Sequence, residues 1–164
     1  KNAVSYKFKI IQFADIHYGE ASDTLWGPEQ DAKSAKVLAD IINAETGDDN
    51  GIDLVVLSGD QLTGNDMNLN ATTYYQNLIQ VLLDAKPDLR WCMIFGNHDD
   101  APMETRPANG TIVYTPAKTS RDQLLEVDMS YAGSFTQSGP DDVFGRSNYI
   151  LPVYYSTDNN VPMA

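Results

Sequence analysis

Three short apolar runs punctuate the N-terminal part of the chain and predict three buried strands. They cover residues 8–14, 52–58 and 91–95 and are rich in β-branched and aromatic side chains. Between them, apolar residues recur at helical spacing over residues 30–44 and 71–86. The order β-α-β-α-β predicts an α/β fold with a mostly parallel sheet covered by helices.

Beyond residue 100 the pattern is less regular. Residues 100–117 are rich in Pro, Gly and Thr and are expected to form a long loop. Ser120 and Gln123 have the spacing of a capping box, which predicts a helix over residues 121–127. Residues 147–155 again have the composition of a strand.

Each of the first three strands runs directly into a short polar motif. The motifs are Asp15-Ile16-His17, Gly59-Asp60 and Gly96-Asn97-His98-Asp99. Ligands bind beyond the carboxyl ends of parallel strands, so the three motifs are expected to form one site. Their carboxylate, imidazole and amide groups suit Zn²⁺, Mn²⁺ or Fe.

Each motif alone has a simpler explanation. An Asp-x-His is common as a cap beside a surface histidine, and Gly-Asp or Gly-Asn pairs are more often turns than ligands. If the first strand stays extended at its end, alternation puts Asp15 and His17 on the same side, as a pair of ligands requires. Gly59 and Gly96 allow tight turns that aim the following side chains over the sheet edge. The combination of motifs favours a site.

In order, spacing and strand context, these motifs resemble the first three of the calcineurin-like metallophosphoesterase superfamily. The residues around Asp15 and Asp60 further resemble the purple-acid-phosphatase-related branch of that superfamily. The chain lacks the tyrosine that this branch often carries after Gly-Asp, so no purple colour is expected. The resemblance implies a sandwich fold, of which this chain would supply the N-terminal half.

The resemblance also implies a phosphatase that acts through two divalent ions and a bridging hydroxide. Asp15, His17 and Asp60 would hold the first ion, while Asp60 and Asn97 would hold the second. His98 would be the catalytic residue, protonating the leaving alkoxide or holding the phosphate. Some relatives place an orienting carboxylate three residues after the bridging aspartate, where this chain has Thr63.

One departure from the superfamily pattern concerns the histidines. The superfamily uses further histidines later in its sequence, whereas this chain contains only two, His17 and His98. Residues 1–164 are therefore expected to be one metallophosphoesterase domain, truncated at its C-terminal side. The alternative is a catalytically incomplete half-domain, or a metal-binding or interaction module, that holds one ion or none. Its partner would then be the missing half or another chain.

Charge and composition exclude several classes of partner. A formal net charge of −12 leaves no basic stripe for nucleic acid or anionic membranes, and no apolar stretch is long enough to span a bilayer. A phosphoester substrate stays compatible, because bound cations would invert the local field. The single cysteine, Cys92, excludes an internal disulfide and is expected to be buried.

Two sequons begin at Asn70 and Asn109. They would permit N-glycosylation if the protein enters the secretory pathway. The sequence does not indicate whether the protein enters that pathway or stays in the cytoplasm.

Overall fold

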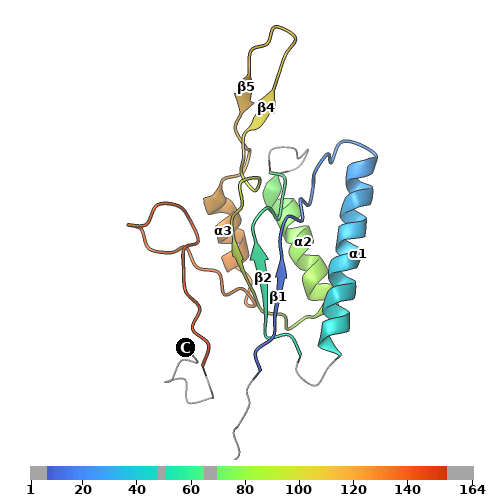
Figure 1. Ribbon diagram of the computed structural model, residues 1–164, viewed down its shortest axis with the longest axis vertical. Coiled ribbons are helices and arrows are strands. Elements are labelled where there is room, and N and C mark those ends of the chain that lie inside the picture. The colour runs from blue at the N-terminus through green and yellow to red at the C-terminus, as the bar shows by residue number, and fades with distance from the viewer. Residues whose placement is uncertain (1–6, 48–50, 65–69, 155–164) are drawn as a thin grey trace, which may run out of the picture.

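The computed structural model describes residues 7–47, 51–64 and 70–154. The elements in chain order are β1 (Ile10–Phe13), α1 (Trp26–Thr46), β2 (Leu54–Ser58), α2 (Ala71–Ala85), β3 (Trp91–Ile94), β4 (Met103–Thr105), β5 (Val113–Thr115) and α3 (Arg121–Met129). The first three strands form a parallel sheet in the order β1-β2-β3, with α2 between α1 and α3 (Figure 1). The predicted α/β fold and β-α-β-α-β order are confirmed.

Alternation along the strands divides the sheet into two faces. Ile11 pairs with Val55, which in turn pairs with Trp91. Val55 and Trp91 belong to the hydrophobic core shared with the helices, and Ile11 packs against it. The opposite face is less covered, since Ile10 is 54% exposed and Ile94 is 44% exposed. Burial of one face fixes the register, because a shift by one residue would exchange the two faces.

The helices begin close to the predicted positions, with one difference. Asn70 caps α2 by accepting a hydrogen bond from the backbone of Thr73, and the predicted capping box of α3 is present. However, α1 begins at Trp26, four residues before the predicted start at residue 30. The backbone of Gly27 packs so closely on Ala21 that a Cβ would collide there. The Gly27 N–H also donates to the Thr24 hydroxyl oxygen at 3.2 Å. The start of α1 thus coincides with contacts that hydrophobic periodicity does not report.

The prediction of a loop over residues 100–117 is wrong. This segment forms the antiparallel hairpin of β4 and β5, which projects from the body of the molecule (Figure 1). Its turn is closed by a hydrogen bond from the Gly110 N–H to the Pro107 carbonyl. The hairpin was missed because its strands are only three residues long, which is too short to create an alternating pattern.

The prediction of a strand over residues 147–155 is also wrong for residues 147–153, and Tyr155 lies outside the described residues. Ser147 takes a left-handed conformation, with φ +58°, that an extended strand excludes. Nearby, the Tyr149 hydroxyl donates a 2.6 Å hydrogen bond to the carbonyl of Met93 in β3. This stretch is therefore held to the sheet by a side chain rather than by a strand ladder.

A fully buried carboxylate, Asp128, joins α3 to α2 and β3. Its Oδ1 accepts 2.6 Å hydrogen bonds from the Tyr75 hydroxyl and from the Trp91 indole N–H. Its Oδ2 accepts a 2.6 Å bond from the Ser134 hydroxyl. Burial, together with the Asp128 charge, raises the pKa of Tyr75 well above its ordinary value, so Tyr75 remains a donor.

Candidate metal centre

The Asp15-Ile16-His17 and Gly59-Asp60 motifs lie side by side beyond the ends of β1 and β2. The Asp15 N–H donates to the Gly59 carbonyl at 3.1 Å, and the His17 N–H donates to the Asp60 carbonyl at 3.0 Å. Asp15, His17 and Asp60 all take left-handed backbone conformations, with φ of 52°, 51° and 51°. Such angles are uncommon for residues other than glycine and cost free energy.

These angles correct one step of the sequence argument. Asp15 and His17 do share a side of the chain, but not because an extended strand continues through them. The chain turns at both residues, and each turn is supported by a hydrogen bond to the neighbouring motif. Strained backbone maintained by its surroundings is found most often at functional sites.

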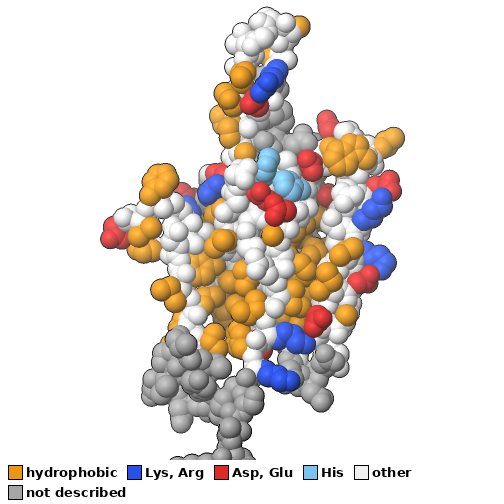
Figure 2. Space-filling view, viewed as in Figure 1, with side chains coloured by type: hydrophobic (Ala, Val, Ile, Leu, Met, Phe, Trp, Pro, Cys, Tyr) orange, Lys and Arg blue, Asp and Glu red, His pale blue; other side chains and the backbone are white. Residues whose placement is uncertain are grey.

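The three side chains converge. Asp15, His17 and Asp60 each offer one ligand atom, and these atoms all lie within 4.8 Å of one another. Asp15 is exposed and His17 is half-buried, whereas Asp60 is only 8% exposed. Both histidines lie beside acidic side chains on the surface near the base of the hairpin (Figure 2). Two carboxylates this close repel each other, and a cation between them would remove that repulsion.

The Gly96-Asn97-His98-Asp99 motif packs directly on Asp60. The His98 N–H donates a 2.6 Å hydrogen bond to Asp60 Oδ1, and a Cβ on Gly96 would collide with the Asp60 side chain. Asn97 is exposed and lies between these two contacts. The fold therefore brings Asn97 to the neighbourhood of Asp60. Asp60 Oδ2 accepts no hydrogen bond among the described residues.

Asp99 ties two of the motifs together. Its buried carboxylate accepts backbone hydrogen bonds from Asp60 at 3.1 Å, from Leu62 at 3.0 Å and from Gly96 at 2.8 Å. Burial raises the pKa of Asp99, although the backbone donors act in the opposite direction. Asp99 thus has a structural role, since its three bonds fix the turns on either side of Asp60.

The two histidine rings are neighbours with different partners. Their centroids lie 4.9 Å apart, and the rings are tilted by 58°. His17 Nδ1 lies 2.9 Å from the hydroxyl oxygen of Thr63, which is buried. His98 Nδ1 is buried and has no hydrogen-bond partner among the described residues. An unpaired buried nitrogen is costly, and this one belongs to a ring that packs on the ring of His17.

Arg121, at the start of α3, anchors the base of the hairpin next to this cluster. Its guanidinium donates to Asp100 Oδ1 and to the Gly96 carbonyl, both at 2.8 Å, and lies over the ring of Phe95. These partners occupy the side chain of Arg121. Its structural role is therefore to hold the loop that carries Asn97 and His98.

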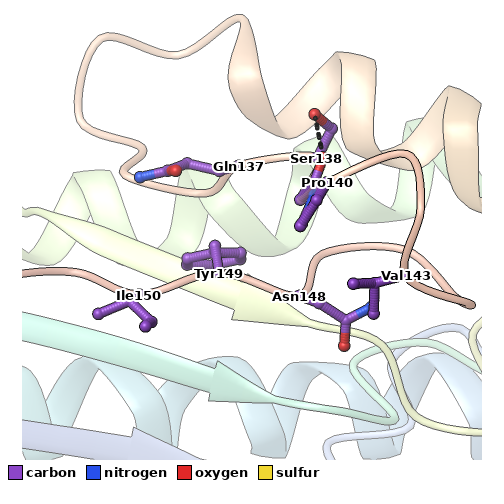
Figure 3. Close-up of a pocket in the computed structure, with 8 residues that line it drawn as sticks. Gln137, Ser138, Pro140, Val143, Asn148, Tyr149 and Ile150 are labelled. Carbon is purple, nitrogen blue, oxygen red and sulfur yellow. Dashed lines mark hydrogen bonds between the residues drawn. The ribbon is translucent and has the colours of Figure 1, made fainter.

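The molecule also has a cavity of about 610 Å³ away from these motifs. Two segments, residues 137–140 and 148–150, provide most of its lining (Figure 3). Its lining contains neither charged groups nor histidines. The convergence of carboxylate and imidazole groups, rather than the size of a cavity, identifies the candidate site.

Comparison with known proteins agrees with this geometry. A family model described as calcineurin-like phosphoesterase matches residues 8–156. The chain belongs to this family. It is also 28% identical over 165 residues to "Phosphatase DCR2" of Saccharomyces cerevisiae, an alignment that covers 96% of this chain and 25% of the yeast protein. The chain therefore spans a quarter of the length of that relative.

The motifs of this phosphoesterase chain are visible in its sequence, but not all of the contacts that support them are. For Asp99 the sequence favours a structural role over orienting His98, and it indicates no role for Thr63. The only signals were their positions, Asp99 directly after His98 and Thr63 three residues after Asp60. Within the described residues, no helix combines the length and the apolar character needed to cross a membrane.

Proposed function

We propose that this chain carries the metal-binding and catalytic residues of a metal-dependent phosphoester hydrolase, a phosphatase with a dinuclear centre. The observation that carries the proposal is the convergence of Asp15, His17 and Asp60 at one edge of the sheet, with ligand atoms within 4.8 Å of one another. Membership of the calcineurin-like phosphoesterase family supplies the reaction class.

The donor set fits a divalent ion. Two carboxylates and one imidazole suit Zn²⁺, Mn²⁺ or Fe, and Asp60 Oδ2 accepts no hydrogen bond from the described residues. Asp60 is the natural shared ligand, because it lies between the Asp15-Ile16-His17 motif and the loop that carries Asn97. Divalent ions held here would neutralise charge on the phosphoryl oxygens and make water more acidic.

The residues of the chain would then perform the following steps. Asp15, His17 and Asp60 would hold the first ion, and Asp60 with Asn97 would hold the second. Water attacks phosphorus in line with the leaving oxygen, the bond between phosphorus and that oxygen breaks, and the protons of the water leave with the product phosphate. His98 gives a proton to the leaving alkoxide, which departs as an alcohol. The backbone N–H of His98 bonds to Asp60 Oδ1, which keeps the residue that carries the proton donor next to the ligands.

A second candidate function is a metal-binding or interaction module without catalysis of its own. It is favoured by the ligand count, because the second ion would have only Asp60 and Asn97 from this chain, which contains two histidines in all. Ligands from a further part of the polypeptide or from a partner chain would complete the centre. For the phosphatase, the residues around Asp15 and Asp60 further support membership of the purple-acid-phosphatase-related branch.

The test is hydrolysis of p-nitrophenyl phosphate by the purified chain with added Mn²⁺ or Zn²⁺, compared with an Asp60→Asn variant. Asp60→Asn retains an oxygen that can accept the His98 N–H bond but removes the charge that binds the ion. Activity that requires both metal and Asp60 supports the phosphatase. Zn²⁺ binding without activity above that of the variant would instead support the non-catalytic module.

A further inference from the structure

We infer that Thr63 is a positioning residue that orients the His17 ring toward the metal ion, an inference that rests on the proposed metal site. Thr63 is only 5% exposed, and its hydroxyl oxygen lies 2.9 Å from His17 Nδ1. The two residues are 46 positions apart in sequence, so tertiary structure creates this contact.

The chemistry of imidazole gives the contact its consequence. A neutral ring carries one N–H, and only the other nitrogen has a lone pair that can bind a metal. If the Thr63 hydroxyl accepts a hydrogen bond from His17 Nδ1–H, the lone pair is on Nε2. A hydroxyl can also donate, so the 2.9 Å contact places the lone pair on Nε2 only when Thr63 accepts. In the inferred arrangement Thr63 accepts, and His17 Nε2 is the ligand atom.

The surroundings hold the hydroxyl in place. The Thr63 N–H donates to the Tyr18 carbonyl at 3.4 Å, and the next residue, Gly64, donates to the His98 carbonyl at 2.9 Å. A Cβ on Gly64 would collide with the carbonyl of Asp99. The backbone around Thr63 is thus bonded to Tyr18, which follows His17, and to His98, so the main chain that carries the hydroxyl is fixed next to His17.

The decisive pair of variants is Thr63→Val and Thr63→Ser. Valine preserves the shape of threonine but removes the hydroxyl, whereas serine keeps the hydroxyl. Hydrogen-bond partners of metal-binding histidines are typically worth a factor of about 10 to 100 in metal affinity. We therefore expect Thr63→Val to weaken Zn²⁺ binding by about that factor, measured by calorimetry, and Thr63→Ser to restore most of the loss.

A second readout needs no metal. In ¹⁵N-histidine spectra of the free chain at mildly alkaline pH, wild-type His17 is expected to carry its proton on Nδ1, and Thr63→Val is expected to give a mixture of tautomers. Because the chain contains only two histidines, His98→Gln assigns the signals. Thr119→Val is the matched control: Thr119 is also buried, but its hydroxyl accepts from the Ala71 N–H instead of facing a histidine.

The outcomes separate the possibilities. Unchanged tautomer and Zn²⁺ affinity in Thr63→Val would overturn the inference. Equal losses in Thr63→Ser and Thr63→Val would also overturn it, because packing rather than the hydroxyl would then matter. A wild-type chain that binds no Zn²⁺ would overturn the proposed function itself, while the tautomer spectra would still decide whether Thr63 sets the ring.

Discussion

Two carboxylates in this molecule, Asp60 and Asp128, are both buried and yet are bonded very differently. Asp128 is 0% exposed, and its two oxygens accept three side-chain hydrogen bonds, all of 2.6 Å. Asp60 is 8% exposed, and only its Oδ1 accepts a described bond, from the His98 N–H. Asp60 also has a left-handed backbone, with φ 51°.

This difference separates stability from function. A saturated buried carboxylate joins elements of the fold, because each donor around it would be left unpaired without it. A carboxylate with an unused oxygen, next to a second carboxylate and on a strained backbone, costs free energy unless a cation is present. Substitution of Asp128 is therefore expected to lower stability, whereas substitution of Asp60 is expected to lower metal affinity.

The largest expected effect on stability comes from Asp128→Ala. It would leave the Tyr75 hydroxyl and the Trp91 N–H buried without an acceptor, at a cost of about 4 kcal/mol in the free energy of unfolding. Urea unfolding measures this loss. Asp128→Asn, which keeps an oxygen facing both donors, should cost about 1 kcal/mol. Equal losses in the two variants would show that the hydrogen bonds are not the cause.

Asp60→Asn is expected to weaken metal binding without lowering the stability of the fold. The variant removes the charge of a metal ligand. Hydrogen-bond partners of metal ligands contribute a factor of up to about 100 to metal affinity, so we expect Zn²⁺ binding to weaken by at least that factor. The free energy of unfolding in the absence of metal should stay the same or rise, because repulsion from Asp15 disappears. Calorimetry and urea unfolding on the same protein check both parts. A marked loss of stability without metal would contradict the comparison.

Asp99→Asn should fall between these two cases. An amide has one oxygen, so one of the three backbone donors that Asp99 now satisfies would lose its acceptor, at a cost of about 2 kcal/mol in stability. The same change would loosen the turns around Asp60 and weaken Zn²⁺ binding. Both losses should appear together. If stability falls while affinity is unchanged, Asp99 supports the fold but not the site.

The smallest effect concerns backbone strain at Asp15. Asp15→Gly removes the penalty for φ 52° and should be about 1 kcal/mol more stable than Asp15→Ala, which keeps it. Both variants lose the carboxylate, so both should bind Zn²⁺ poorly. Thermal unfolding of the two variants without metal provides the comparison. No difference between them would mean that the left-handed turn at Asp15 costs little.

Apolar periodicity and capping residues were sufficient to predict the helices and the strands of the parallel sheet. They failed for segments whose structure depends on contacts distant in the sequence. The strands of the sheet and the helix over α2 follow from apolar periodicity, and α3 follows from the Ser120 and Gln123 capping box. The β4 and β5 hairpin was missed because strands of three residues are too short to create an alternating pattern. Residues 147–153 have the composition of a strand, yet Ser147 takes a left-handed conformation that interrupts an extended chain.

By itself, the sequence determined that three polar motifs follow three strands of one parallel sheet, and therefore that they meet at one edge. Only the tertiary structure decided how they meet: through left-handed turns, through the Asp99 carboxylate, and through a Thr63 hydroxyl on His17. The partners in these bonds lie 37 to 46 residues apart. Periodicity and propensity act between neighbours along the chain, so the choice of a distant hydrogen-bond partner is made only when the chain has folded.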